Sequence, residues 1–501
     1  MADKINQYFE AEFKFVALFV ALGYFLKNYI PGLIEGGRWD LYQQIAMADR
    51  FLAGKGLYYS TIEASSPYFP GVSFLSTFIS TFAYPYRDYI LLFMASLIGT
   101  LFALMLVKLA VDFGCKKQIA LIAVFGLLYW GFDEYRGYMH EFKADSLILL
   151  CGISICYLQE QIELRKNIKH THLLAGIFIL GLVMDITKQQ AVYVNIALVI
   201  YAIFCMPCSW NTKSMIMAVL ASAGFVALGI IFSIPDVEII AIENLKDMPY
   251  HFPKDIIWSM AGDFRGHKIF FMLLFYFVFL LCSGKTKLSL LQKKWLLISV
   301  LFGAAQIVGG WKTGGNAGNY EAGMVCFLPF VALAANNIFE QFINTSKKDF
   351  MIVLGGIFII VLSLVNIGKV MIIDVPRKLI PTMNENRLVS EYLSQHCEGE
   401  TIMYYSNQYM QIIRSSAVPG MDIYTVPSNI ERYWDTRTEA LKEKRYKYLY
   451  VNQENFKYWD EASVKYFQYN PDSYKALMDN YEAIQDDEIP DSLKGQLFIA
   501  R

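Results

Sequence analysis

Residues 350–373 read FMIVLGGIFIIVLSLVNIGKVMII, and the polar stretch DVPRKL follows at once from Asp374. A helix needs about 20 mainly apolar residues to cross the ~30 Å hydrocarbon core of a bilayer, so this run predicts a membrane-spanning helix. Similar apolar runs fill the chain before Asp374, whereas residues 374–501 have the composition of a polar domain. The sequence therefore predicts a transmembrane domain over 1–373 and a separate domain over 374–501.

The overall composition fits a membrane protein. The chain of 501 residues is 55% hydrophobic and 18% charged, whereas soluble domains are roughly 45–50% apolar and about 25% charged. Its net charge is −1 and no Lys/Arg-rich tract occurs, which gives no basis for a nucleic-acid partner. The cysteines show neither a disulfide framework nor metal-ligand spacing. No cofactor is expected, and a divalent metal stays an open option.

Eleven apolar segments predict an all-α polytopic membrane domain. Residues 13–34 lack a small-x-small cleavage site, so they are interpreted as the first span and not as a signal peptide. The further predicted spans lie near 88–111, 118–131, 144–159, 172–186, 190–206, 214–234, 268–283, 293–310, 322–340 and 350–373.

Lysine and arginine predict the orientation, because they are enriched in the cytoplasmic loops of membrane proteins. With the N-terminus inside, the cytoplasmic segments hold 13 Lys/Arg in 60 residues and the opposite loops hold 11 in 114. Pairs such as Lys293-Lys294 are typical cytoplasmic anchors. The odd number of spans then places 374–501 outside a cell membrane, which we predict to be a bacterial plasma membrane. The run 72–83 would disturb this pattern as a span, so it is predicted to be an interfacial helix on the outer surface.

The polar tail predicts a small α/β domain. Helical periodicity covers 385–395 and 430–442, an apolar run covers 401–405, and the segments 446–451 and 496–500 read as strands.

The outer loops carry the residues that could perform chemistry. The first of these loops, 33–87, places Asp40 shortly after the first span, among glycines and aromatic residues. Later outer loops place further acids, cations and amides at the same membrane face. Ionisable groups at membrane depth are costly and are functional-site candidates by default. We therefore expect these groups to converge in a polar cavity.

This arrangement resembles the GT-C superfamily of polytopic glycosyltransferases. The matching elements are Asp40 after the first span, a Tyr-rich loop ending in Pro67-Tyr68-Phe69-Pro70, a surface helix, and an acidic second outer loop with Asp133 and Glu134. A C-terminal extracytoplasmic domain completes the match. The motifs look most like bacterial transferases that use polyprenyl-phosphate hexose or mannose, and less like the lipid A aminoarabinose transferase. The single Asp40 departs from the Asp-Glu pair of the protein O-mannosyltransferases.

The resemblance implies transfer of a hexosyl or pentosyl group from a polyprenyl-phosphate donor to an acceptor hydroxyl on a glycan, lipid or protein, with inversion. Phosphate leaves without a proton at neutral pH, so the reaction needs one base and cations that hold the phosphate. Asp40 is the candidate base. The candidate phosphate ligands are Arg136, Lys143, Lys188 and Lys312. The candidate substrate-binding residues are Trp39, Tyr42, Tyr58, Tyr59, Asp133, Glu134, Gln189, Asn316, Asn319, Tyr320 and Glu321.

Simpler interpretations stand beside these roles. Asp40 precedes a helical pattern and could be an N-cap, while the cations and aromatic residues could be interfacial anchors. A transporter or flippase of lipid-linked sugars or solutes is the alternative function, although transporters often carry internal repeats and midplane sites that this sequence lacks. A non-catalytic scaffold would leave the loop acids unexplained.

Overall fold

A computed structural model describes residues 13–35, 39–52, 54, 56–57, 69–83, 86–132, 135, 137, 142–164, 171–235, 237, 265–311, 317–342, 345–397, 402–404, 417–418, 435, 438–451 and 471–501. By contacts, the chain forms two compact units. Unit 1 comprises Met1–Pro31, Phe93–Gly229 and His251–Ile373, and unit 2 comprises Gly32–Leu92, Ile230–Tyr250 and Asp374–Arg501.

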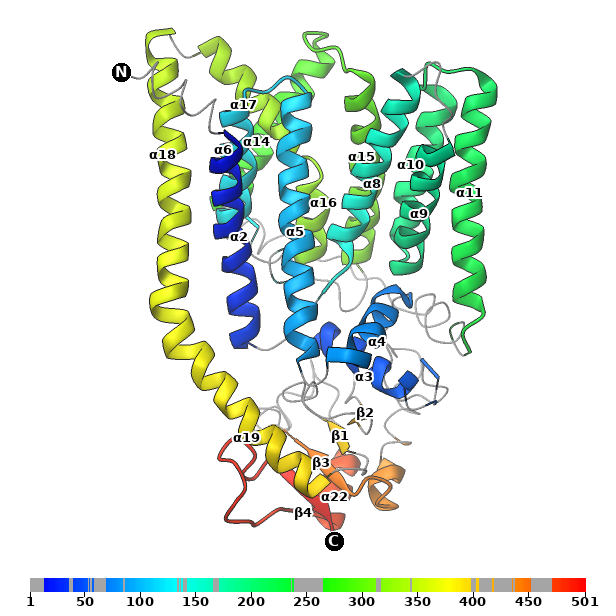
Figure 1. Ribbon diagram of the computed structural model, residues 1–501, viewed down its shortest axis with the longest axis vertical. Coiled ribbons are helices and arrows are strands. Elements are labelled where there is room, and N and C mark those ends of the chain that lie inside the picture. The colour runs from blue at the N-terminus through cyan, green and yellow to red at the C-terminus, as the bar shows by residue number, and fades with distance from the viewer. Residues whose placement is uncertain are drawn as a thin grey trace. The chain divides into compact units, whose positions relative to one another are not determined.

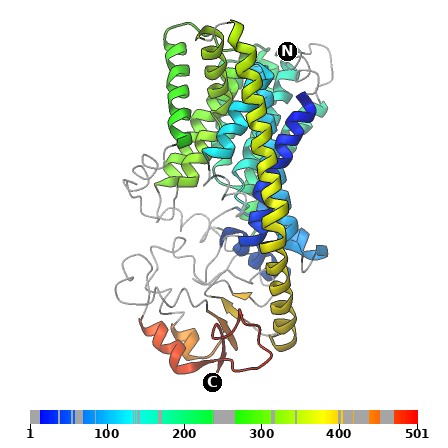
Figure 2. The same cartoon turned by 90° about the vertical axis from the view of Figure 1, so that its left-hand side faces the viewer.

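Unit 1 is a layer of long helices that run side by side (Figures 1 and 2). The helices bury a continuous cluster of aliphatic and aromatic side chains between them. Large apolar side chains such as Phe15, Phe225, Met272 and Val365 are exposed. Apolar residues on both the inside and the outside of a helix bundle are the pattern expected in lipid. The helices are α2 (Phe13–Glu35), α5 (Arg87–Asp112), α6 (Lys117–Trp130), α8 (Asp145–Leu164), α9 (Thr171–Thr187), α10 (Ala191–Phe204), α11 (Trp210–Phe232), α14 (Arg265–Cys282), α15 (Leu290–Gly310), α16 (Ala317–Val325), α17 (Leu328–Phe342) and α18 (Thr345–Lys369).

Each of the eleven predicted spans coincides with helix in the structure. Among the described residues, six helices are long and apolar enough to cross a membrane, or seven if one bent pair counts as a span. The predicted helical, polytopic membrane protein is therefore confirmed, while the number of eleven spans stays a prediction. The run 72–83 is also helical, as α4 (Gly71–Ala83), and is one of the shorter apolar helices.

The predicted span 322–340 is a broken helix. Helices α16 and α17 meet at an angle of 58°, at a break followed closely by Pro329, which has no N–H to continue the helical ladder. The Cys326 carbonyl accepts hydrogen bonds from Trp295 Nε1 at 2.8 Å and Ser299 Oγ at 3.1 Å. Two side chains of α15 thus satisfy a backbone group that the break would leave without a helical partner.

The chain passes Asp374 without leaving the helical conformation. Helix α18 continues into the π-helix η2 (Val370–Leu379), which contains Pro376, and then into α19 (Ile380–Cys397). A π-helical turn widens the backbone, which can accommodate the proline ring. The segments 350–373 and 385–395, predicted as separate elements, therefore belong to one helical run, seen at the left of Figure 1.

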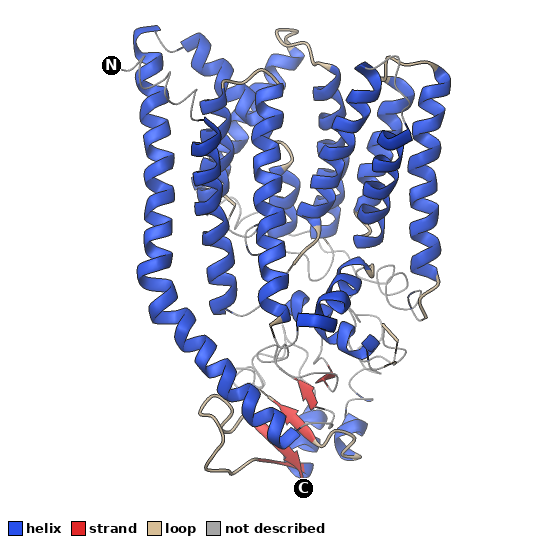
Figure 3. Cartoon of the chain, viewed as in Figure 1, coloured by secondary structure: helices blue, strands red, loops and turns tan. Residues whose placement is uncertain are grey.

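The tail in unit 2 contains a five-stranded mixed sheet in the order β2-β1-β3-β5-β4 (Figure 3). Strand β1 pairs in parallel with β2 and β3, whereas β5 pairs antiparallel with β3 and β4. The predicted strands at 446–451 and 496–500 correspond to β3 and β5. The strands are β1 (Ile402–Tyr404), β2 (Ala417–Val418), β3 (Tyr448–Tyr450), β4 (Tyr481–Ala483) and β5 (Leu497–Ala500), and helix α22 (Pro471–Asn480) precedes β4.

A single introduced cysteine tests the predicted outside location of the tail. Native Cys397 is 1% exposed, so its thiol would not react with a reagent on either side of the membrane. We therefore choose the exposed Gln485. We expect Gln485→Cys to react with a membrane-impermeant maleimide on intact cells. Native Cys282 is exposed at a predicted cytoplasmic helix end and provides the control, reacting only after permeabilisation. Labelling of Gln485→Cys only after permeabilisation would place the tail inside.

Candidate functional site

A buried ion pair lies at one end of the unit 1 helices. Lys188, in the turn between α9 and α10, donates to both carboxylate oxygens of Asp145 in the first turn of α8, at 2.9 and 3.1 Å. The two side chains are 3% and 1% exposed. Gln306 Nε2 of α15 donates to the same carboxylate at 2.5 Å. Side chains from the α9–α10 turn and from α15 thus meet on one carboxylate of α8.

Glu321 of α16 forms the centre of a second buried group at this end. Its Oε1 lies 3.0 Å from His267 Nε2 of α14, and its Oε2 accepts the Tyr135 backbone N–H at 2.7 Å. When the carboxylate is ionised, Nε2 is the protonated imidazole nitrogen in this contact. The Tyr135 hydroxyl lies 2.6 Å from Ser146 Oγ, next to Asp145. Tyr135 thus contacts both Glu321 and the chain neighbour of Asp145, and the two groups together with Tyr135 are called the buried network below.

The short loop that enters α8 is conformationally constrained. Phe142 is buried and has a φ of 51°, in the left-handed region that non-glycine residues rarely adopt. It precedes Lys143, whose side chain is half-buried, and lies three residues before Asp145. Such outliers persist where surrounding packing over-determines the backbone, often at functional sites.

Tyr320 packs on a glycine at the end of α15. A Cβ on Gly310 would lie 2.8 Å from Tyr320 Cζ, whereas one on Gly309 would meet its nearest neighbour, Gln190 Nε2, at 3.7 Å. The Tyr320 ring is buried, so it has little room to withdraw. Gly310 therefore sets the position of a predicted substrate-binding residue.

We expect Gly310→Ala to displace Tyr320 and lower stability by about 1–3 kcal/mol, the usual cost of overpacking. Gly309→Ala adds the same methyl group one residue earlier, at ordinary contact distance, and should leave both properties unchanged. The measurements are the melting temperature in detergent and the affinity for the substrate, which Tyr320 is predicted to bind. Equal behaviour of the two variants would argue against this role for Gly310.

The predicted site residues fall into three groups. Lys188 and Glu321 belong to the buried network, and Lys143, Gln189, Asn319 and Tyr320 lie close to it in sequence, at the same helix ends. Trp39, Asp40 and Tyr42 lie in helix α3 (Trp39–Leu52), but only their backbone is described. Outside the described residues lie Tyr58, Tyr59, Asp133, Glu134, Arg136, Lys312 and Asn316.

A further ion pair lies at the opposite helix ends. Lys294 of α15 contacts Glu163 of α8 at 3.0 Å with both side chains at most 5% exposed, and the Tyr201 hydroxyl donates to Glu163 at 3.0 Å. Lys294, predicted as part of a cytoplasmic anchor, is thus buried and paired within the bundle. Its ammonium is satisfied inside the bundle, where an unpaired charge would be costly.

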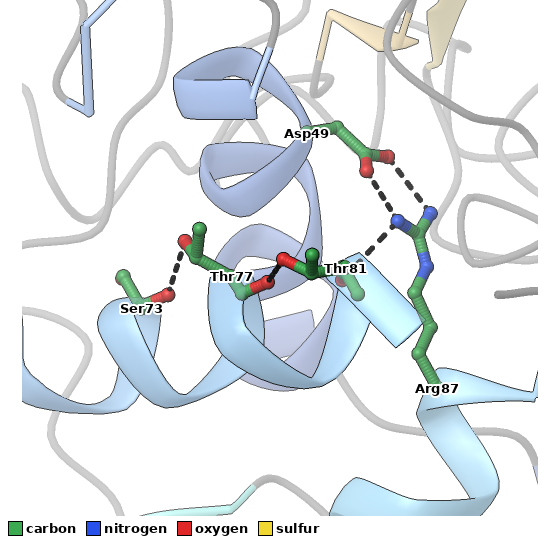
Figure 4. Close-up of polar contacts among 6 residues, drawn as sticks. Asp49, Ser73, Thr77, Thr81 and Arg87 are labelled. Carbon is green, nitrogen blue, oxygen red and sulfur yellow. Dashed lines mark hydrogen bonds and ion pairs between the residues drawn. The ribbon is translucent and has the colours of Figure 1, made fainter. Parts of the chain in front are cut away.

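Within unit 2, polar contacts connect α3, α4 and the start of α5, and Figure 4 draws the contact of Arg87 with Asp49. Gln44 of α3 accepts a hydrogen bond from Ser73 of α4 at 2.5 Å. Arg87, at the start of α5, makes a bidentate ion pair with Asp49 of α3, with Nη2 2.8 Å from Oδ2. Asp40 lies within the first turn of the described α3, not directly before it, as an N-cap would.

Comparison with solved structures identifies the fold. The sequence matches no protein-family model and no curated protein. ArnT from Cupriavidus metallidurans bound to undecaprenyl phosphate aligns over 97% of this chain and 98% of its own, with a TM-score of 0.55 at 10% identity. The oligosaccharyltransferase AglB from Archaeoglobus fulgidus, in complex with an inhibitory peptide and a dolichol-phosphate, aligns over 93% of this chain and 72% of its own, with a TM-score of 0.56 at 9% identity. The chain is thus a helical membrane protein that shares its fold with ArnT and AglB.

Proposed function

We propose that this chain is a membrane glycosyltransferase that transfers a sugar from a polyprenyl-phosphate donor to an acceptor hydroxyl at the outer membrane face. The observation that carries the proposal is the buried charged network of Asp145, Lys188, Gln306, Glu321 and His267, set at one end of a GT-C-like bundle. ArnT and AglB share this fold and have been solved with undecaprenyl phosphate and dolichol-phosphate.

The proposed sugar transfer needs only a few catalytic groups. The lipid phosphate leaves as an anion, so cations or N–H donors stabilise the departing charge, and a carboxylate removes the proton of the acceptor hydroxyl. We propose Asp40 as that base, with inversion at the sugar carbon as the consequence of a single displacement. Lys143 and Lys188 are the described candidates for the phosphate. Of these, Lys188 is neutralised by Asp145 and would need to exchange that partner for the phosphate.

Native mass spectrometry of the purified protein tests the proposal. We expect a co-bound polyprenyl-phospho-sugar, and transfer of its sugar to an acceptor in membranes supplied with that donor. A protein that binds the lipid, never turns it over, and moves it between leaflets of a proteoliposome would instead be a flippase. The charged network would then serve translocation.

A further inference from the structure

We propose that Arg87 and Asp49 form a positioning clamp that sets the placement of helix α3, and with it the backbone of Asp40. This inference deepens the proposed function and rests on it. Neither Arg87 nor Asp49 lies in the network of unit 1, and the contacts used here are all within unit 2.

The clamp joins helices α3 and α4 to the first residue of α5. Arg87 precedes the long apolar part of α5, and its guanidinium meets both oxygens of Asp49, near the end of α3. Arg87 Nη1, which contacts Asp49 Oδ1, also donates to Ser80 Oγ of α4 at 3.4 Å. A planar guanidinium and a planar carboxylate in bidentate contact restrict rotation as well as distance, so α3 is held in one orientation against Arg87 and α4.

The burial of this pair is extreme for charged residues. Arg87 is 0% exposed and Asp49 2%. Removing two charges from water is expensive, and apolar residues of similar volume are often as stable or more stable. Stability alone therefore does not explain an ion pair at this position. An ion pair does fix the orientation of the two segments that carry it, whereas apolar contacts are non-directional.

Helix α3 transmits the restraint to Asp40. Gln44 is hydrogen-bonded to buried Ser73 of α4, so α3 is fixed at a second point one turn beyond Asp40. Met47 packs in a small apolar cluster with Leu57, Ile231 and Val237. A helix rises 1.5 Å per residue, so Asp49 lies only about 13 Å along the axis from Asp40. A tilt at the clamp therefore displaces the first turn of α3.

A double variant distinguishes a positioning role of the clamp from a purely stabilising one. Arg87→Met alone leaves Asp49 buried without its ion-pair partner and should lower the melting temperature strongly. Asp49→Leu/Arg87→Met removes both charges and should restore most of that temperature. We expect kcat of sugar transfer in this double variant to stay at least tenfold below wild type. Hydrogen exchange of the α3 amides should be at least tenfold faster. Arg387→Met, which breaks the exposed Arg387–Glu391 pair, is the matched control and should change none of these.

Recovery of both melting temperature and kcat in the double variant would overturn the proposal, because the pair would then be purely structural. Unchanged exchange of α3 would overturn it as well. If the double variant does not fold, Arg87→Lys keeps the charge and loses the bidentate fork. It must then show a reduced kcat with a near-normal melting temperature. The proposed function is judged separately by wild-type transfer and by Asp40→Asn, and the exchange rates report the clamp whatever that outcome.

Discussion

Asp40→Asn is expected to abolish sugar transfer while leaving expression, melting temperature and donor binding close to wild type. The amide has the shape of the carboxylate but cannot take the proton of the acceptor hydroxyl. General base catalysis typically contributes 10²–10⁴-fold, so kcat should fall by about that factor. Turnover of a polyprenyl-phospho-sugar and native mass spectrometry of the bound lipid are the two measurements.

The same substitution tests the simpler role of Asp40. Asparagine caps helices as well as aspartate does, so an N-cap would tolerate the change with full activity. The first turn of a helix also favours a negative side chain by about 0.3–1 kcal/mol, a loss too small to explain an inactive enzyme. Full activity in Asp40→Asn would contradict the assignment and transfer the search to Asp133, Glu134 and Glu321.

The helical segments could be predicted because membrane spans depend on length and apolarity, which a sequence displays directly. The break at Cys326–Phe327 was not predicted, since it depends on Trp295 and Ser299 of another helix, which donate hydrogen bonds to the freed Cys326 carbonyl. Strand β4 and the two-residue β2 were also missed. Such short strands are specified by their neighbours more than by their own composition.

The site residues were predicted only where polar groups interrupt or flank apolar runs. Lys188 and Glu321 met this criterion, and the structure places both in one buried network. Gln306 and His267 lie at the ends of apolar helices and resemble ordinary flanking residues in sequence. Their role depends on which carboxylate they reach, Asp145 or Glu321, and that pairing joins segments more than 50 residues apart. Periodicity and composition carry no information on such contacts.

Lys188→Ala is expected to destabilise the protein by about 3–5 kcal/mol, because it leaves the Asp145 carboxylate buried without its cation. This is a large share of the 5–15 kcal/mol that stabilises a typical domain. Melting temperature in detergent is the measurement. Lys108→Ala is the control, since Lys108 pairs with Asp112 at an exposed site, where a salt bridge contributes at most about 1 kcal/mol. A Lys188→Ala protein that melts like wild type would mean that Asp145 is neutral or finds another cation.

The double variant Asp145→Leu/Lys188→Met then decides whether Lys188 also serves the donor. Removing both charges should recover most of the lost stability, as it does for many buried pairs, so any remaining defect concerns function. A hydrogen bond to a charged group contributes about 1.5–3 kcal/mol. Loss of such a bond would weaken binding of the polyprenyl-phospho-sugar by roughly tenfold or more. Normal donor binding in the double variant, once its stability is recovered, would mean that Lys188 serves only the ion pair. The phosphate role would then rest on Lys143 and, outside the described residues, on Arg136 and Lys312.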